Sequence, residues 1–292
     1  MNVRELIDGH KAVFSFEFFP PKTQEDAQAL FQTISTLKTL EPSFVSVTHT
    51  QSGGDPLKTA VLADKIKEDH DIEPMAHFTC IAHSRAEVKL MVEHLRQHNI
   101  HNVLALRGDI PTNSAATIKR EYHHASELVR ELSALGGFCI GVAGYPEKHP
   151  EAPSLEADIA RLKEKVDAGA SFVITQLFFD NADYFSFVAK CVATDIRVPI
   201  VPGIMPITSY KQLKRFSEMC GTRIPPQMAE DLEKIKDDSA AIIAYGVEYA
   251  YKQCWQLLNA GVPGLHFYTL NRSHSTLNIL RRLKEKHERL RP

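Results

Sequence analysis

Short apolar runs alternate with longer amphipathic stretches along the whole chain. Eight of these runs are rich in β-branched and aromatic residues and apolar almost throughout, as strands buried on both faces of a parallel sheet are. We therefore expect eight strands, at Val13–Phe19, Phe44–Thr50, Met75–Cys80, Asn102–Arg107, Phe138–Ala143, Phe172–Phe178, Val198–Pro202 and Gly264–Leu270.

The stretches between these runs carry a helical period. Val88, Met91, Val92 and Leu95, for example, fall on one helical face. Residue types that commonly end helices precede several of the predicted strands. They are Asn99, Gly136, Gly169 and Gly261.

Eight strand–helix units without a Pro/Gly/Ser-rich linker predict an α/β fold of the closed (β/α)8 type, a TIM barrel. We expect residues 1–292 to form one catalytic domain, since such barrels reach about 250 residues or more as a single unit. An open, doubly wound sheet is the main alternative. The segment Ile204–Pro263, between the last two strands, is long enough for two or three helices, so extra helices are expected there.

Composition narrows the class of protein further. The 292 residues include 34 basic and 36 acidic side chains, so no electrostatic signature of a nucleic-acid or membrane partner is present. No apolar run approaches the ~18 residues that span a bilayer, and the N-terminal segment does not resemble a signal peptide. The five cysteines are widely spaced, without a CxxC pair, and indicate reduced thiols. We therefore expect a cytoplasmic protein.

The chemistry of such a barrel lies at the C-terminal ends of its strands. Alternation along the first strand directs Phe14, Phe16 and Phe18 to one face, and Ser15 and Glu17 into the barrel. Burial disfavours the charged form of a carboxyl group, which makes Glu17 a candidate general acid. The alternative is a structural ion pair with a neighbouring strand.

Other strand ends also carry polar groups. Thr48 and His49 follow the second strand, and Arg107, Gly108 and Asp109 follow the fourth. Gly108 would let a flat ligand approach the backbone closely. A histidine on the third strand, at position 77, is equally compatible with a core residue whose hydrogen bonds are satisfied.

The sequence lacks residues and motifs that several other kinds of enzyme require. No strand ends in the lysine of a Schiff-base aldolase, and neither a GxxxxGK[ST] nor a strand-linked GxGxxG motif occurs. His94 and His98 have metal-ligand spacing but no accompanying third ligand, so we expect no metal site. A barrel lyase, a metal-dependent hydrolase and a non-catalytic binding protein remain alternatives at this point.

The chain closely resembles the methylenetetrahydrofolate reductase family of the bacterial, single-domain type. Its motifs occur in the family's order over essentially the whole chain. They are SFEFFPP at Ser15–Pro21, FVSVT at Phe44–Thr48, LRGD at Leu106–Asp109, YPEKHPEA at Tyr145–Ala152, KVDAGA at Lys165–Ala170, ITQLFFD at Ile174–Asp180, VPGIMP at Val201–Pro206 and FYTLNR at Phe267–Arg272.

The resemblance implies a (β/α)8 barrel that carries FAD. It also implies ping-pong hydride transfer: a reduced nicotinamide cofactor, NADH or NADPH, reduces FAD, and 5,10-methylenetetrahydrofolate then takes the hydride at the same face. The bacterial type resembles NADH users, whereas the sequence itself leaves NADH and NADPH as alternatives. The product, 5-methyltetrahydrofolate, supplies methyl groups for methionine synthesis. Related bacterial enzymes are tetramers, so a homo-oligomer is expected.

Individual roles follow from the same resemblance. Glu17 matches the general acid that protonates the leaving folate nitrogen, and Asp109 matches a carboxylate near flavin and folate. The folate contacts would be Gln176, Gln212, Phe216 and Arg272. Phe216 would stack on either substrate, and Thr48 and Gln176 would contact the nicotinamide cofactor.

The matched FAD positions come from strand ends and the loops that follow them. They are His49, Gln51, His77, Arg107, Gly108, Asp109, Ala125, Tyr145, His149, Ala152, Asp158, Arg161 and Lys165. Lys165, Arg161 and His149 would offset the charge of the pyrophosphate, and Asp158 would accept a ribose hydroxyl. The chain departs from many relatives at His49 and His124, where they have tyrosine, and in the loop Thr112–Lys119.

Overall fold

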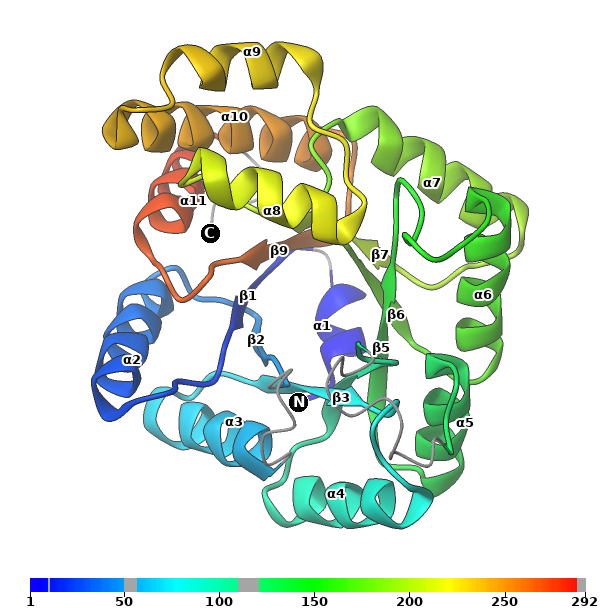
Figure 1. Ribbon diagram of the computed structural model, residues 1–292. Helices are drawn as coiled ribbons and strands as arrows, with labels where there is room; N and C mark the ends of the chain where they lie inside the picture. Colours follow the sequence, from blue (N-terminus) through cyan, green and yellow to red (C-terminus); the bar gives the residue numbers. More distant parts are fainter. Residues whose placement is uncertain (10, 50–56, 110–120, 288–292) are drawn as a thin grey trace.

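A computed structural model describes residues 1–9, 11–49, 57–109 and 121–287. Parallel strands form a barrel that is surrounded by helices (Figure 1). The strands are β1 (Val13–Phe18), β2 (Phe44–Val47), β3 (Pro74–Thr79), β4 (Asn102–Leu106), β5 (Cys139–Gly144), β6 (Phe172–Thr175), β7 (Ile200–Val201), β8 (Gly203–Ile204) and β9 (Gly264–Tyr268). The predicted TIM barrel is confirmed, and the open sheet is ruled out.

The seventh predicted strand closes the barrel in two pieces. β7 pairs with β6, whereas β8 pairs with β9, and Pro202 lies between them. The Pro202 carbonyl still accepts a hydrogen bond from the His266 N–H, at 3.0 Å. The prediction of one strand over Val198–Pro202 was wrong in its bounds, because proline has no N–H to donate to a neighbouring strand.

Helices follow the strands around the barrel. They are α1 (Val3–Ile7), α2 (Gln24–Lys38), α3 (Leu57–His70), α4 (Arg85–Gln97), α5 (Ala125–Leu135), α6 (Leu155–Asp167), α7 (Asn181–Ala193), α8 (Tyr210–Cys220), α9 (Pro226–Lys234), α10 (Ser239–Asn259) and α11 (His274–Lys286). Thr23 and Ser84 begin α2 and α4 with capping boxes, each satisfying a free N–H of the first turn. Asn99, Gly136, Gly169 and Gly261 all have positive φ, as expected for helix ends.

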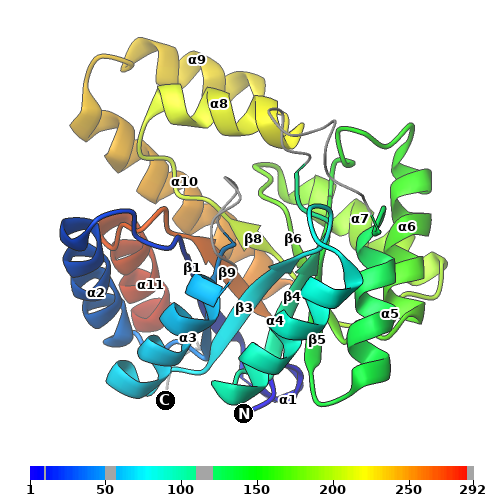
Figure 2. The same cartoon turned by 60° about the horizontal axis from the view of Figure 1, so that its bottom comes forward.

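Side-chain alternation separates two packed layers. Phe14, Phe16 and Phe18 of β1 pack with α2 residues such as Leu30 and Ile34, outside the barrel. The interior near the N-terminal ends of the strands is filled by a second apolar cluster that includes Val3 and Ile7 of α1. Figure 2 shows α1 beneath the strands, so the barrel is filled at this end and ligands must enter at the other.

The long segment between the last two strands forms three helices. α10 packs against α11 and α7, as part of the outer layer. α8 and α9 stand above the C-terminal ends of the strands (Figure 2). An apolar cluster that includes Leu213, Met228 and Ile242 joins the three helices to the loops after β6 and β8. The expected extra helices are therefore present, and α8 forms one wall of the barrel mouth.

Candidate active site

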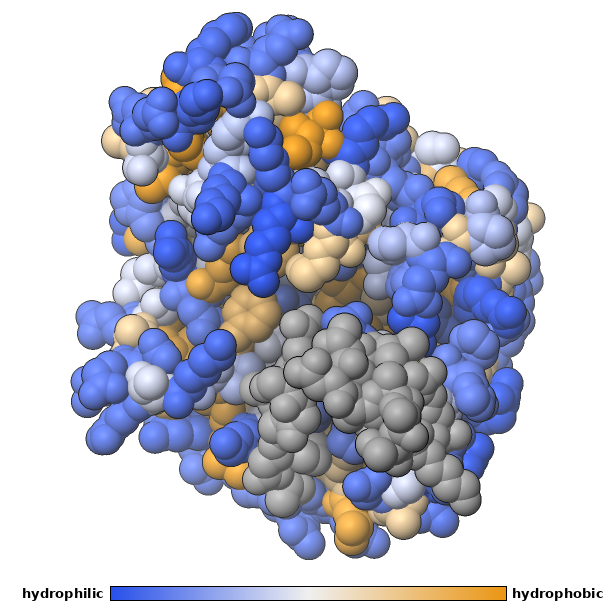
Figure 3. Space-filling model, viewed as in Figure 1, coloured by the Kyte–Doolittle hydropathy of each residue, from blue (hydrophilic) through white to orange (hydrophobic). Residues whose placement is uncertain are grey.

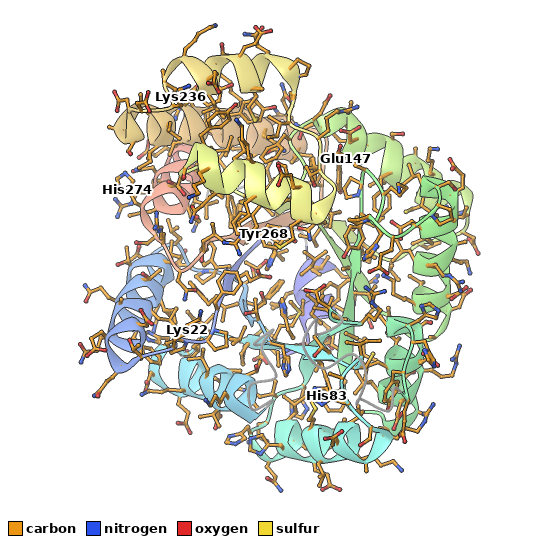
Figure 4. All side chains as sticks on the ribbon, viewed as in Figure 1. Lys22, His83, Glu147, Lys236, Tyr268 and His274 are labelled. Carbon is orange, nitrogen blue, oxygen red and sulfur yellow. The ribbon has the colours of Figure 1, made fainter. Side chains whose placement is uncertain are left out.

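A large cavity opens at the C-terminal ends of the strands. Its volume is about 1770 Å³, and strand ends, the loops after them, α6 and α8 all contribute to its walls. Apolar residues are recessed beneath α8 in the middle of this face (Figure 3). Figure 4 shows Lys22, His83 and Tyr268 on three sides of the mouth. A cavity of this size can hold two extended ligands together.

Glu17 lies near the bottom of this cavity, at the end of β1. The residue is only 8% exposed, and its Oε2 lies 3.4 Å from Nε2 of His77 and 3.8 Å from Nε2 of His266. Among the described residues no lysine or arginine forms an ion pair with it. The structural ion pair with a neighbouring strand, which the sequence left open, would need a protonated His77 or His266 in this part of the chain.

The two imidazoles beside Glu17 are buried. Burial lowers the pKa of His77 to about 4, although the Glu17 charge opposes this shift and His266 and His49 add to it. His77 is therefore neutral at pH 7. The Ser15 Oγ and His266 Nδ1 atoms lie 2.7 Å apart, within hydrogen-bonding distance. Within the described residues, Nε2 of both histidines lacks a hydrogen-bond partner, so the carboxyl group faces two buried imidazole nitrogens.

Basic groups gather on the opposite wall, from β4 to α6. Lys165 lies beneath β5 and donates a hydrogen bond to the Ala143 carbonyl at 2.5 Å. Burial lowers its pKa to about 8, partly offset by the negative charge of Asp158. Arg107 makes two hydrogen bonds to Glu151, at 2.5 and 2.7 Å. This wall can attract the phosphates of a nucleotide.

Gly108 follows Arg107 with φ of +85°. A Cβ there would lie 3.0 Å from the Cβ of Thr79, and the backbone conformation itself favours glycine. Asp109 comes next and lies near enough to Arg107 and Tyr145 to raise the pKa of each by its charge. The turn thus presents bare backbone and a carboxylate to the same cavity.

His49 stands at the mouth, at the end of β2. Its ring meets that of His83 edge-on, with 5.8 Å between ring centres. Burial lowers the pKa of both rings, and repulsion from a charged His83 lowers the pKa of His49 further. Nδ1 of His49 is buried without a hydrogen-bond partner among the described residues. This nitrogen remains available to a ligand.

The other wall carries amide and aromatic groups. Gln176 follows β6, and its Oε1 accepts a hydrogen bond from the Leu177 N–H at 2.8 Å. Phe216 projects from α8 into the lining. Gln212, one turn earlier, lines a small adjoining cavity, and its Oε1 is buried without a partner in the described part of the chain. Flat ligands would meet the Phe216 ring and the Gln176 carboxamide at this wall.

Most of the predicted site residues meet at this one cavity. Those lining it are Glu17, Thr48, His49, His77, Arg107, Gly108, Asp109, Ala125, Tyr145, His149, Ala152, Asp158, Arg161, Lys165, Gln176 and Phe216. Arg272 is exposed on the loop after β9 and is not part of this lining. Gln51 and the loop Thr112–Lys119 lie outside the described residues.

Sequence reasoning assigned no role to several residues of the lining. Lys22, Arg215 and Tyr268 border the cavity, and the Tyr268 hydroxyl donates to the Thr175 carbonyl at 2.6 Å. Alternation along the last strand places His266 and Tyr268 on the inner face with Glu17, and this signal could have identified both. The two cations lie in a loop and on an exposed helix face, where no local pattern marks them.

Two other properties bear on function. In the described ranges, no group of three or more His, Cys, Asp and Glu side chains is arranged to hold a metal ion. His98 instead pairs with Asp64 of α3, and the ring of His94 packs against it. None of the helices described is long and apolar enough to cross a membrane.

The family model and the relatives that match this chain all point to one family. The family model described as "Methylenetetrahydrofolate reductase" matches residues 2–284. The "5,10-methylenetetrahydrofolate reductase" of Escherichia coli is 40% identical over 265 residues, which are 91% of this chain and 88% of that protein. "Methylenetetrahydrofolate reductase (NADH) 1" of Arabidopsis thaliana is 37% identical over 96% of this chain and 50% of the plant protein.

A solved structure shares the fold at much lower sequence identity. It is described as an "Uncharacterized protein from Clostridium thermocellum" that "binds two copies of 5-methyl-5,6,7,8-tetrahydrofolic acid". The TM-score is 0.66 and the identity 15%, with 98% of each chain covered. This likeness supports the barrel fold of the chain.

Proposed function

The chain belongs to the methylenetetrahydrofolate reductase family, a family of oxidoreductases, and from this premise we propose the reaction of its active site. The proposed reaction is the FAD-dependent reduction of 5,10-methylenetetrahydrofolate to 5-methyltetrahydrofolate, with NADH as the reductant. The observation that carries the proposal is the buried Glu17 carboxyl, without a cationic partner in the described chain, in a cavity large enough for two ligands.

The residues present fit FAD. Lys165 supplies positive charge for its phosphates, and Gly108 leaves bare backbone where a flat ring can approach. The unpartnered Nδ1 of His49 offers a further polar contact. When bound, FAD would accept hydride from the nicotinamide and deliver it to the folate. We propose that these residues orient it so that one face stays open toward Glu17.

Glu17 is the proposed general acid. Opening the five-membered ring of the substrate leaves a nitrogen that must gain a proton as its bond to carbon breaks. A buried carboxyl group beside the neutral His77 imidazole can hold that proton and donate it. The separation of 3.4 Å from His77 leaves the Glu17 oxygen free of a short, charge-assisted bond that would compete for this role.

The remaining residues would orient the substrate and stabilise charge. Asp109 would stabilise the positive charge that develops on the ring-opened folate. Gln176 would bind either the folate or the nicotinamide, and Phe216 would stack on whichever is present. One wall for both substrates requires the first product to leave before the second substrate binds, as in a ping-pong mechanism.

The proposal also includes a choice between NADH and NADPH as the reductant. Related proteins are named for either one: the Arabidopsis relative is named for NADH, and a Caenorhabditis elegans relative, 36% identical, is named "Probable methylenetetrahydrofolate reductase (NADPH)". We favour NADH, as in the bacterial type. We also propose a cytoplasmic homo-oligomer, a tetramer by resemblance, whose product supplies methyl groups for methionine synthesis.

Glu17→Gln tests the proposed acid because it keeps the shape of the side chain and removes the proton. In anaerobic stopped-flow experiments, reduction of bound flavin by NADH should stay within about twofold of the wild type. Reoxidation by methylenetetrahydrofolate should slow by about 10²–10⁴-fold, the usual contribution of a general acid. Glu93→Gln, on an exposed position of α4, is the matched control and should change neither rate.

Two outcomes would contradict this assignment. Equal loss of both half-reactions would make Glu17 a structural or shared residue. Unchanged reoxidation would show that the proton comes from elsewhere. Turnover lost on treatment with a chelator, in a protein without a flavin spectrum, would instead support a metal-dependent hydrolase.

A further inference from the structure

The strand pairing beside Glu17 ends abruptly. Glu17 pairs with Tyr268 in the last register position that β1 shares with β9. Beyond it, Leu270 and Asn271 adopt φ of +51° and +58°, in the left-handed region that a branched residue such as leucine rarely occupies. The chain therefore turns away from β1 just where the proposed acid is held.

Beyond the last backbone pairing of β1 with β9, two side chains form the hydrogen bonds to the end of β1. The Thr269 hydroxyl donates to the Glu17 carbonyl at 2.6 Å and accepts from the Asn271 N–H at 3.2 Å. The Asn271 carboxamide bonds to Phe19 in both directions: its Oδ1 accepts from the Phe19 N–H at 2.8 Å, and its Nδ2 donates to the Phe19 carbonyl at 2.9 Å. A carboxamide has the same donor and acceptor as a peptide unit, so Asn271 takes the place of a missing residue of β9.

These bonds hold the end of β1 on its β9 side. On its β2 side, the Phe18 carbonyl accepts a hydrogen bond from the Thr48 N–H at 2.9 Å. Pro20 and Pro21 follow immediately and cannot donate to a neighbouring strand. The Phe19 N–H is therefore the last backbone donor of this segment, and Asn271 is its partner.

We propose that Thr269 and Asn271 are positioning residues that fix the Glu17 carboxyl for proton transfer. The inference rests on the proposed function, because it assumes that Glu17 delivers the proton. It gives a reason for the unfavourable conformation of Leu270, because the left-handed turn brings the Asn271 carboxamide opposite Phe19. A small displacement of a reacting group lowers a rate steeply, so loosening this end should slow proton transfer before it affects binding.

Asn271→Gly in the FAD-loaded enzyme is the direct test, because glycine accepts the left-handed backbone and removes only the side-chain bonds. We expect reoxidation of reduced flavin by methylenetetrahydrofolate to slow at least about tenfold. Reduction by NADH and the Kd for FAD should stay within about twofold. Amide hydrogen exchange over residues 17–19 should accelerate.

The chain offers a matched control. Asn99 also has positive φ, +52°, and its exposed side chain makes no hydrogen bond to the described residues. Asn99→Gly therefore repeats the backbone change without removing the proposed contacts, and both half-reactions should keep the wild-type rates. Thr269→Val should reproduce the Asn271→Gly phenotype, whereas Thr269→Ser, which retains the hydroxyl, should restore most of the reoxidation rate.

Three outcomes would overturn the inference. They are wild-type reoxidation in Asn271→Gly, equal loss of both half-reactions, and unchanged exchange over residues 17–19. Failure of the proposed function looks different, since the wild type itself would not be reoxidised by the folate. Amide exchange would still decide in that case whether Asn271 and Thr269 fix the end of β1.

Discussion

Burial determines the protonation of the side chains around the cavity. It makes His77 neutral at pH 7, with a pKa of about 4, and brings the pKa of Lys165 down to about 8. Glu17 thus faces the uncharged His77 imidazole, while the opposite wall retains a positive charge near neutral pH. The cavity therefore separates a wall suited to proton donation from a wall suited to phosphate binding.

Lys165 should make FAD affinity depend on pH. Below its pKa of about 8 the ammonium is charged and attracts the phosphates; above it, binding must also take up a proton. The Kd for FAD should therefore rise from pH 8 to 9, by up to about tenfold. Lys165→Met should bind FAD more weakly at pH 7 and show a flatter pH dependence, measured by quenching of flavin fluorescence.

Lys163→Met is the control for this prediction. Lys163 lies on the same helix but pairs with Asp167 and does not line the cavity. Its replacement should leave both the affinity and the pH dependence as in the wild type. Parallel pH profiles for the wild type and Lys165→Met would show that another group controls binding.

The sequence pattern within one strand predicted the direction of some site residues, but it could not predict contacts between strands. The inward direction of Glu17 follows from alternation within one strand, which needs no tertiary information. The contacts of Glu17 with His77 and His266 cross from one strand to others and depend on the register of the barrel. Asn271 was matched only as part of a motif, because its partner Phe19 lies 252 residues away.

Among the elements, the broken seventh strand is the feature that most shapes the barrel. Gly203 begins its second piece, and its N–H donates to the Thr175 hydroxyl at 2.9 Å. A Cβ at this position would lie 2.2 Å from the Thr175 carbonyl oxygen and 2.6 Å from the Tyr268 ring. Only glycine lets the strands on both sides approach this closely.

Gly203→Ala should therefore destabilise the barrel strongly. We expect a loss of about 3 kcal/mol or more in the free energy of unfolding, because the clash is with backbone. Gly137→Ala is the comparison: Gly137 has φ of +82°, but an added methyl carbon would have no atom within 4 Å, so only backbone strain of about 1–2 kcal/mol applies. Equal losses in urea unfolding would mean that the close approach at Gly203 is relieved by movement.

Element types were easier to predict than element ends. The eight apolar runs predicted the barrel because strands buried on both faces are apolar at most of their positions. The break at Pro202 was missed because Val198–Pro202 is a short apolar run, and such a run does not reveal which neighbour each residue pairs with. The left-handed turn at Leu270 was missed for a similar reason, since leucine gives no local signal for it.

At the scale of the whole molecule, the two ends of the barrel differ. α1 fills the end at the N-termini of the strands, and the cavity occupies the other end beside α8. The side chains of the site come from strands and helices far apart in sequence, and closure of the barrel brings them together. The proposed ping-pong reaction fits this arrangement, since both proposed substrates would use one opening in turn.

We propose that this opening passes hydride from a nicotinamide to a folate through FAD. The most direct measurement is an anaerobic visible spectrum of the FAD-loaded protein, recorded first with NADH and then with methylenetetrahydrofolate. We predict a flavin band that bleaches with NADH and returns when the folate is added. A protein that stays colourless after incubation with FAD, or a bleached band that the folate does not restore, would contradict the account.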